Sequence, residues 1–453
     1  MPIRAFTPIL VLCSVIFLTP TSANASEILA GPMVGHVTES TASIWVRTTR
    51  NALLEAEAIQ NNARIPGSLQ RLEVGGFSLF QFEGLIPDSP VHVTIREMKD
   101  GVAIESHDLL FHTAAPPEPT GTLRIAFGSC SKDSRFPFIP VYEAMGFEQA
   151  DIAIFVGDNT YFTVGEGDWS TSGPIGDWNS IEQMVSRHMR TRTNVYLQNL
   201  MRNTPSYGIW DDHDYGPNNA DRELESRDQA LEIFKSVWAN PYYGTPQTPG
   251  IFSKFRRGPA DIFLMDDRYH KYVSTGAHPD VSGDDAVIWG DDQLEWLCDE
   301  LKRSNAPIKI IANGTQVISK DGRGEGHFNE APQEIDRLLK FLKKNEIGGV
   351  IFLSGDRHFT EVLRLDQDAA PSIVEFTSSP FQQMSPVAPF ERDHDTNVWA
   401  MRGNSYGLVT INVEANGEGS VRFEMRDANN FVPDMNGKPA IYEVKLEELM
   451  YAK

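Results

Sequence analysis

The chain has 453 residues, with 40 Lys and Arg against 62 Asp and Glu, which gives a formal net charge of −22 at pH 7. A hydrophobic content of 41% and a charged content of 23% are typical of a folded protein, and the length allows more than one domain. Such a negative charge argues against nucleic-acid binding and against adsorption to anionic membranes, because both need clustered Lys and Arg. It suits a protein that binds cations.

The first 25 residues predict a secretory signal peptide. Arg4 supplies the positive start, residues 6–18 are mostly apolar, and Ala23-Asn24-Ala25 is a small-x-small cleavage pattern. The apolar stretch is too short to span a bilayer, and we expect no later membrane span. The sequence therefore predicts a protein that starts at Ser26 after export to the periplasm or the extracellular space.

Residues 27–115 predict a small all-β sandwich domain. Apolar and polar residues alternate in three short segments, 42–47, 77–82 and 90–96, and Gly, Pro, Asn and Asp separate them. The Pro-rich segment 116–119 then predicts a stiff linker and a domain boundary.

Residues 120–453 predict a second domain in which strands and helices alternate, as expected for an α/β sheet covered by helices on both faces. The expected strands are 123–127, 151–156, 207–210, 260–265, 308–312 and 349–354, and the expected helices are 141–147, 181–203, 291–304 and 332–345. Three further strands, 408–413, 421–425 and 441–444, follow, and a terminal helix that would cover a site is not evident.

Polar residues follow six of these strands. Each segment alone is typical of a turn, because Asp, Asn and Gly tolerate turn geometry. In α/β sheets, however, the carboxyl ends of the strands meet at one rim, where ligands bind, so the six together predict a metal site. The segments are Gly128-Ser-Cys130, Gly157-Asp-Asn-Thr-Tyr161, Asp211-Asp-His-Asp214, Asp266-Asp-Arg-Tyr269, Asn313-Gly-Thr-Gln316 and Gly355-Asp-Arg-His358.

The two cysteines beyond the signal peptide allow two interpretations. Cys130 and Cys298 could form one disulfide in an oxidising compartment. Alternatively, Cys298 belongs to the apolar face of the helix expected at 291–304, while Cys130 offers a thiolate at the end of a strand. We favour the second interpretation because the two cysteines lie in such different local patterns.

The residue types at the strand ends point to particular ions. A phenol has a pKa near ~10, so phenolate ligation at neutral pH requires a strongly Lewis-acidic cation, and ferric iron is the natural candidate. Further carboxylate and amide oxygens favour a hard second ion such as calcium, with other divalent metals as an option. Two neighbouring cations suit phosphoryl transfer. The first set of ligands is Cys130, Asp158, Tyr161, Asp356 and His358, and the second is Asp212, Asn218 and Asn219.

These motifs resemble those of known phosphatases. Residues 157–161 resemble the Gly-Asp-x-x-Tyr block of purple acid phosphatases. Together with segments 127–130, 210–214, 267–268 and 355–358, they are similar to the signature blocks of the alkaline phosphatase D family of metallophosphoesterases, in the same order. The resemblance implies an α/β fold with metallophosphoesterase-like sheet layers flanked by helices. A small all-β sandwich domain would precede this catalytic domain.

The resemblance also implies roles for single residues. Four residues would hold ferric iron, and one of them, Asp158, would bridge to a neighbouring calcium. His213 would act as general acid or substrate contact, and Arg268 would contact the phosphate unless it forms an ion pair with Asp266 or Asp267. Asp211 and Asp214 are expected to cap or orient their neighbours. The iron ligands would be Cys130, Asp158, Tyr161 and His358, and the other metal ligands would be Asp212, Asp356 and the pair Asn218 and Asn219.

The sequence departs from the family pattern in two places. The expected signal peptide has no twin Arg, which favours general secretion. The segment 215–217 shifts the pair Asn218 and Asn219, so the choice between these two as metal ligand stays open.

The preferred function is therefore a secreted metal-dependent phosphoesterase that hydrolyses phosphomonoesters, phosphodiesters or both by a metal-activated hydroxide. The alternative is a non-enzymatic, cation-dependent cell-surface binding protein with the β-sandwich as its adhesive element. That alternative does not account for Cys130 and Tyr161 at strand ends. A carbon–oxygen esterase is a third option, but no Ser nucleophile motif supports it. The physiological ester and the oligomeric state stay open.

Overall fold

A computed structural model describes residues 28–49, 52–72, 74–133, 138–161, 180–274, 279–322, 326–383, 388–389, 392 and 394–452. The expected signal peptide, residues 1–25, lies outside the described residues. None of the helices within these ranges has the length and apolar character that crossing a bilayer requires.

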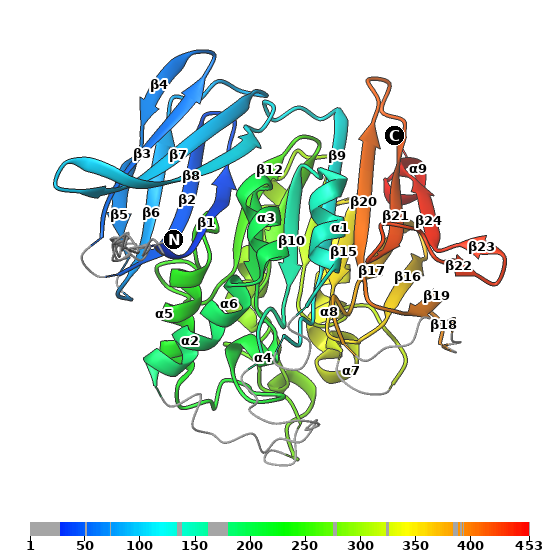
Figure 1. Cartoon of the computed structure of the whole chain (residues 1–453). Helices are drawn as coiled ribbons and strands as arrows, with labels where there is room; N and C mark the ends of the chain where they lie inside the picture. Colours follow the sequence, from blue (N-terminus) through cyan, green and yellow to red (C-terminus); the bar gives the residue numbers. More distant parts are fainter. Residues whose placement is uncertain are drawn as a thin grey trace, which may run out of the picture.

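The N-terminal part consists of two four-stranded antiparallel sheets, with strand orders β1-β2-β6-β5 and β4-β3-β7-β8 (Figure 1). Apolar side chains from both sheets, such as Ile44, Phe80 and Val93, form one buried core between them. The predicted all-β sandwich is confirmed. Its strands are β1 (Ile28–Val37), β2 (Thr41–Thr48), β3 (Leu53–Gln60), β4 (Ala63–Pro66), β5 (Ser68–Arg71), β6 (Phe77–Glu83), β7 (Pro90–Lys99) and β8 (Val102–His112).

The rest of the chain contains two larger sheets, one of six strands in the order β11-β10-β9-β20-β21-β24 and one of eight in the order β12-β13-β14-β15-β17-β16-β19-β18. The strands of the first are β9 (Gly121–Gly128), β10 (Ile152–Val156), β11 (Ser206–Ile209), β20 (Ser405–Val413), β21 (Gly419–Asp427) and β24 (Ile441–Lys445). Those of the second are β12 (Ser253–Arg257), β13 (Ala260–Leu264), β14 (Ile308–Ala312), β15 (Val350–Ser354), β16 (Thr360–Gln367), β17 (Ala370–Thr377), β18 (Ala388–Pro389) and β19 (Asn397–Arg402). A small hairpin of β22 (Asp434–Met435) and β23 (Lys438–Pro439) lies near the end of the chain.

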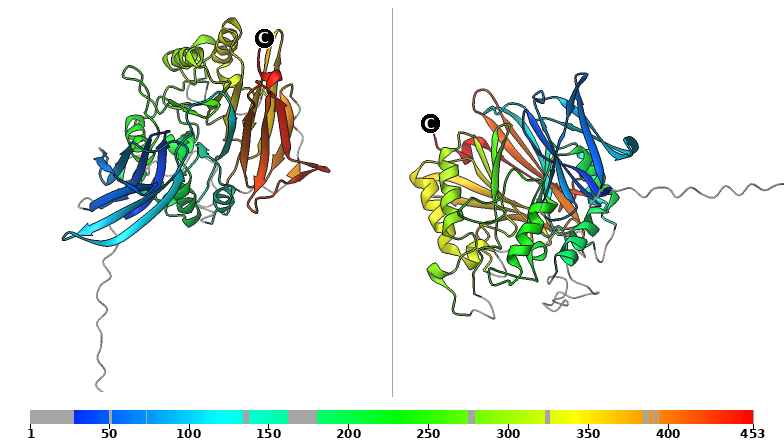
Figure 2. Two further views of the ribbon diagram at one scale, coloured as in Figure 1. Left: turned by 90° about the horizontal axis from the view of Figure 1, so that it is seen from above. Right: turned by 90° about the vertical axis from the view of Figure 1, so that its left-hand side faces the viewer.

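Both faces of the eight-stranded sheet are buried. Ile262 and Leu264 of β13 belong to the core that this sheet shares with the six-stranded sheet. The intervening Phe263 and the next residue, Met265, belong to a second core beneath α6 (Asp291–Arg303) and α8 (Pro332–Lys344), which lie along one side of the molecule in Figure 2. This explains the uninterrupted apolar runs of the central strands.

The arrangement corrects one expectation. The strands that precede the six polar segments do not share the rim of a single sheet, because β9, β10 and β11 lie in one sheet and β13, β14 and β15 in the other. The predicted α/β fold class, with sheet layers flanked by helices, is confirmed.

The helical stretch expected at 181–203 is present but interrupted, since the structure has two helices there, α2 (Ile181–Arg192) and α3 (Val195–Asn203). The Asn194 side chain accepts hydrogen bonds from the backbone N–H groups of Tyr196 and Leu197, and so caps a new helix. Asn is among the preferred N-cap residues, which explains the break. The other helices are α1 (Val141–Glu148), α4 (Asp212–Tyr215), α5 (Arg227–Val237), η2 (Gly283–Asp285), α7 (His327–Glu330) and α9 (Leu446–Leu449).

The terminal helix α9 lies far from the polar strand ends. Its Leu449 carbonyl accepts a hydrogen bond from the N–H of Gly349, at the amino end of β15, with a distance of 2.6 Å. Asp356 and His358 follow the opposite end of that strand. In the described part of the chain, α9 therefore leaves the polar strand ends uncovered.

Candidate metal centre

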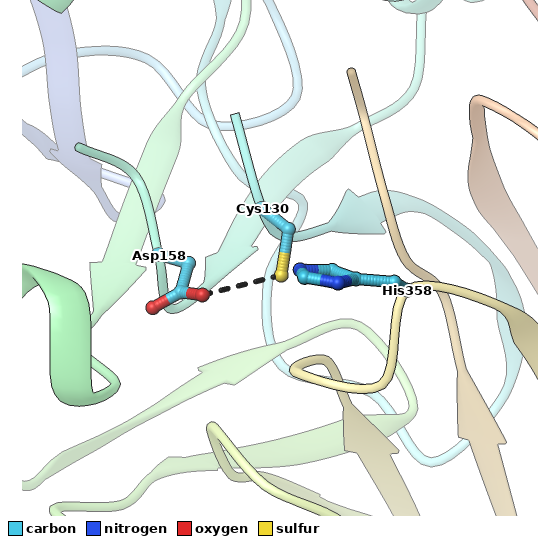
Figure 3. A group of neighbouring side chains, drawn as sticks. All are labelled: Cys130, Asp158 and His358. Atoms are coloured by element: carbon cyan, nitrogen blue, oxygen red, sulfur yellow. Dashed lines mark hydrogen bonds between the residues drawn. The ribbon is translucent and has the colours of Figure 1, made fainter. Parts of the chain in front are cut away.

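The ends of four strands from both sheets meet at one place. Cys130 follows β9, Asp158 and Tyr161 follow β10, Asp212 and His213 begin α4 directly after β11, and Asp356 and His358 follow β15. Figure 3 shows the side chains of Cys130, Asp158 and His358 pointing toward one another from three separate segments. The predicted meeting of these segments is therefore present, although two sheets contribute to it.

Two glycines allow this close approach. A Cβ atom on Gly355 would lie 2.4 Å from the Ser129 Oγ atom and 2.7 Å from the Val156 carbonyl oxygen. Gly157 has a φ of +88°, and a Cβ atom there would lie 2.5 Å from the Cβ atom of Asp211. Larger residues at these positions would push apart the strand ends that carry the polar side chains.

Four of the candidate ligands have left-handed backbone conformations. The φ angles are 62° for Cys130, 52° for Asp158, 64° for Asp356 and 55° for His358. Non-glycine residues adopt such angles infrequently, at a cost of roughly 1–3 kcal/mol in sparsely populated regions, and they cluster at functional sites. The backbone thus turns sharply at each strand end and directs these side chains inward.

The residues expected to hold iron lie together. Single ligand atoms of Cys130, Asp158 and His358 all lie within 4.8 Å of one another. The Tyr161 hydroxyl donates to Asp158 Oδ2 at 2.9 Å and lies 3.5 Å from His358 Nε2. The thiol of Cys130 donates to the same Oδ2 at 3.4 Å. The disulfide alternative is wrong in this structure, because Cys130 and Cys298 are both free.

A second group of ligands shares one member with the first. Ligand atoms of Asp158, Asp212 and His213 also lie within 4.8 Å of one another. Asp158 Oδ1 accepts a hydrogen bond from the His213 backbone N–H at 3.2 Å, while Oδ2 faces Cys130 and Tyr161. One carboxylate therefore faces two groups of potential metal ligands, as a bridging ligand must.

The donor set fits a cation site. Burial raises the pKa of Asp158, and nearby carboxylates led by Asp212 raise it further. Burial likewise raises the pKa of Cys130 and of Tyr161, with Asp158 as the next cause for both. Burial, followed by nearby His213, lowers the pKa of His358 to about 4, so its ring is neutral at pH 7. A neutral imidazole can bind a cation directly. The raised pKa values of the three buried acids mean that a nearby positive charge is needed to ionise them, and a bound cation would supply that charge.

The remaining expected metal ligands are Asp212, Asp356 and the pair Asn218 and Asn219. The Asn219 backbone N–H donates to Asp212 Oδ2 at 2.8 Å, and the Asn218 amide donates to the Asn219 side-chain oxygen at 2.7 Å. Asp356 Oδ2 accepts from the Thr315 hydroxyl at 3.4 Å, and its backbone carbonyl lies 3.7 Å from the Cys130 sulfur. The asparagine pair thus reaches Asp212 through a backbone group rather than through an amide side chain.

Arg268 is placed differently from the expected phosphate contact. Its side chain is 0% exposed, and Nε donates to Asp211 Oδ1 at 2.6 Å, while Asp267 Oδ1 lies 3.9 Å away. Asp266 instead accepts from the backbone N–H groups of Arg268 and Tyr269. The structure favours an ion pair for Arg268, with a main partner, Asp211, that was not expected.

Asp214 orients the turn that carries Asp158. Its carboxylate accepts hydrogen bonds from the backbone N–H groups of Asn159, Thr160 and Asp211, at distances of 2.8, 3.1 and 3.1 Å. Burial raises its pKa to about 8 despite these bonds. This geometry supports the capping interpretation of Asp214.

Sequence reasoning overlooked two cationic residues at the site. The Lys132 Nζ atom lies 5.6 Å from the centroid of the Tyr161 ring. Arg357 stands between Asp356 and His358, with Nη1 at 3.7 Å from Asp356 Oδ2. The available signal was their position in the sequence, since Arg357 lies inside the segment 355–358 and Lys132 follows the segment 127–130 by two residues.

The chain is similar to known phosphatases. Residues 125–430 match the family model of PhoD-like phosphatases. Alkaline phosphatase D of Bacillus subtilis (strain 168) is 22% identical over 292 residues, which are 56% of this chain and 49% of the relative, so the match spans about half of the relative's length.

Two solved structures share the fold. The structure of PhoD has a TM-score of 0.72 at 16% identity and covers 93% of this chain and 89% of its own. Purple acid phosphatase PPD1 from yellow lupin (Lupinus luteus) seeds has a TM-score of 0.59 at 11% identity, with coverages of 91% and 73%. The resemblance expected from the motifs is confirmed. Because the family model matches more than half of the residues, the chain belongs to the PhoD-like phosphatase family, a family of phosphoesterase hydrolases.

Proposed function

We propose that the chain is an exported, metal-dependent phosphoesterase that hydrolyses phosphomonoesters, phosphodiesters or both. The observation that carries the proposal is the position of Asp158, whose two carboxylate oxygens face two groups of metal-binding side chains. Paired cations are suited to phosphoryl transfer, and the family to which the chain belongs supports a phosphate ester as substrate.

Iron and calcium would divide the ligands at Asp158. Cys130, Tyr161 and His358 would hold ferric iron on the Oδ2 side, whereas Asp212, with Asp356 and the pair 218–219, would hold calcium. When bound, these ions would supply Lewis acidity toward the phosphoryl oxygens and neutralise developing negative charge. The protein's part is to hold the ligands rigidly, which the hydrogen bonds to both oxygens of Asp158 support.

His213 is the proposed proton donor to the leaving oxygen, so in this proposal Asp212 and not the His213 ring binds the second ion, although both belong to the same group of potential ligands. Its backbone is fixed by the hydrogen bond to Asp158, and its ring lies against Tyr161 with a centroid distance of 4.3 Å. Its Nε2 atom lies 3.9 Å from Asp212 Oδ1, so the two groups attract when the imidazole carries a proton. The side chain is 17% exposed, which lets it exchange protons with solvent.

One assay separates this proposal from a non-enzymatic binding protein. The purified chain is given a chromogenic phosphomonoester and a chromogenic phosphodiester, before and after chelation. We expect turnover that chelation abolishes. Asp158→Asn is expected to reduce it by ~100-fold or more, because loss of a group that only supports a metal ligand already costs about 10- to 100-fold and Asp158 is proposed to bind both ions directly. Asp108→Asn, at an exposed position on β8, serves as the matched control. Full turnover in Asp158→Asn, or no turnover of either ester in metal-loaded wild type, would contradict the proposal.

A further inference from the structure

We propose that Lys132 and Arg357 hold the non-bridging oxygens of the substrate's phosphoryl group and thereby favour phosphomonoesters over phosphodiesters. This inference rests on the proposed function and adds to it the substrate class and two substrate contacts.

Lys132 places an ammonium group at the edge of the candidate metal centre. It follows Cys130 by two residues, and its backbone N–H donates to the Gln382 carbonyl at 3.2 Å. The residue is only 6% exposed, and Nζ lies 5.6 Å from the centroid of the Tyr161 ring. The hydroxyl of that tyrosine in turn contacts Asp158 at 2.9 Å. The ammonium group is thus held in the site rather than extended into solvent.

Arg357 borders the same site from the β15 side. Nη1 lies 3.7 Å from Asp356 Oδ2, and Nη2 lies 3.6 Å from Asp321 Oδ2. Arg392 donates a hydrogen bond to the same Asp321 oxygen, so this carboxylate is shared by two guanidinium groups. The side chain is 16% exposed, so the guanidinium is attracted by two carboxylates and is still accessible to a ligand.

Two cationic side chains beside a metal centre indicate that an anionic ligand binds between them. A fixed positive charge beside a cation site weakens metal binding by Coulomb repulsion, and this is costly in a partly buried site. An anionic ligand between them reverses the effect, because it is attracted by the metal ions and by both side chains. Arg268, the cation expected from the sequence to meet the phosphate, is fully buried against Asp211. Lys132 beside Tyr161 and Arg357 beside Asp356 are the cations that we assign to this role instead.

The number of cations also bears on the substrate class. A phosphomonoester near neutral pH carries close to two negative charges and three non-bridging oxygens, whereas a phosphodiester carries one charge and two such oxygens. A guanidinium can bind two oxygens of the same phosphoryl group, and an ammonium can bind the third. The full set of contacts is therefore available only to a monoester.

The test uses the full metal-loaded chain and the variants Lys132→Met and Arg357→Ala, with p-nitrophenyl phosphate and bis(p-nitrophenyl) phosphate as substrates. Loss of one charge-assisted contact is expected to raise KM for the monoester, and Ki for inorganic phosphate, by about 10- to 100-fold. The diester KM is expected to rise less than the monoester KM in both variants, and by less than about threefold in Lys132→Met, because the third oxygen that the ammonium would bind is absent from a diester. Metal content is expected to be unchanged. Lys340→Met and Arg337→Ala, at exposed positions on α8, are the matched controls.

Charge-retaining variants distinguish the loss of a phosphate contact from misfolding. Lys132→Arg and Arg357→Lys are expected to keep a lower monoester KM than the neutral variants. Equal effects on both esters, or an unchanged Ki for phosphate, would overturn the inference while leaving the proposed function intact. If wild type hydrolyses neither ester, the proposed function fails, and calorimetric titration with inorganic phosphate decides the inference. Phosphate binding that Lys132→Met abolishes supports it, and binding equal to wild type overturns it.

Discussion

Arg268 and Asp211 form a fully buried ion pair, with Nε of the arginine 2.6 Å from Oδ1 of the aspartate. Asp211 follows β11 of the six-stranded sheet, and Arg268 follows β13 of the eight-stranded sheet. The next two residues after Asp211 are Asp212 and His213 of the candidate metal centre. The ion pair therefore joins the loops of the two sheets directly behind the site.

Breaking this pair is expected to destabilise the protein. Arg268→Met leaves a buried carboxylate without its cation, and Asp211→Asn removes the main anionic partner of a buried guanidinium and leaves Asp267, at 3.9 Å. Loss of one partner from a buried pair typically costs about 3–5 kcal/mol. Urea unfolding of each variant should show a loss of this size, together with weaker activity because Asp212 and His213 shift.

The double variant Arg268→Met with Asp211→Asn provides the control. It removes both charges, so its loss of stability is expected to be clearly smaller than the sum of the two single losses. If Arg268→Met instead unfolds like wild type and raises only KM, Arg268 acts as the phosphate contact expected from the sequence.

Gly355→Ala is expected to disturb the junction of the two sheets. The added Cβ atom would lie 2.4 Å from the Ser129 Oγ atom, so the strand ends must move apart. Overpacking of this kind costs about 1–3 kcal/mol, and it would also displace neighbouring Asp356. Thermal unfolding and metal analysis should both show a decrease.

Gly146→Ala in α1 is the matched control for that substitution. The nearest atom to its added Cβ would be 4.0 Å away, and Ala is the better helix former. Its melting temperature should equal or slightly exceed that of wild type. A Gly355→Ala protein as stable as the control would show that the strand ends do not meet as closely as described.

The metal content of variants tests the shared carboxylate. Asp158→Asn is expected to lower the content of both ions, whereas Tyr161→Phe is expected to lower iron alone and to remove visible tyrosinate absorption. Elemental analysis and absorption spectra give the two readings. His107→Gln is the control, because His107 forms a separate group with Glu97 and Glu105 in the β-sandwich. Retained visible absorption in Tyr161→Phe would contradict iron ligation by the phenolate.

The sequence predicted the central strands well because their burial leaves a local pattern. Every residue of β10 (Ile152–Val156) and β15 (Val350–Ser354) is buried. Strands that are buried on both faces have nearly continuous apolar sequences, so these two strands could be predicted from the sequence alone. The turns that follow these strands could also be predicted, because Gly and Asp tolerate the backbone angles that turns require.

The parts that the sequence left undetermined depend on contacts between distant segments. The main partner of Arg268 lies 57 residues away after a strand of the other sheet, whereas the sequence suggested the local acids Asp266 and Asp267, of which Asp267 is a weaker partner at 3.9 Å. The division of the strands between two sheets likewise arises from pairing partners such as β20, which joins the chain's last third to β9. The break at Asn194 could have been predicted locally, because Asn is a preferred helix-capping residue. The apolar periodicity of the helical stretch does not show this break.

The stability of the α8 side of the protein should depend on acid pH through Glu334. This carboxylate is 1% exposed and accepts hydrogen bonds from His327 and from the backbone N–H groups of Ile288, Trp289 and Gly290. Burial opposes its ionisation, but His327 and the backbone donors outweigh burial and lower its pKa below the ordinary value of 4.5.

A lowered pKa in the folded state means that the ionised carboxylate stabilises the fold above the unfolded-state pKa. That contribution disappears as the pH falls through the lower folded-state pKa. Between pH 7 and pH 3 the melting temperature of wild type should therefore decrease more than that of Glu334→Gln, which starts lower because its neutral amide accepts these bonds weakly. Glu447→Gln, at a position 75% exposed on α9, should follow wild type throughout. Parallel curves for Glu334→Gln and wild type would show that another group governs the acid limit.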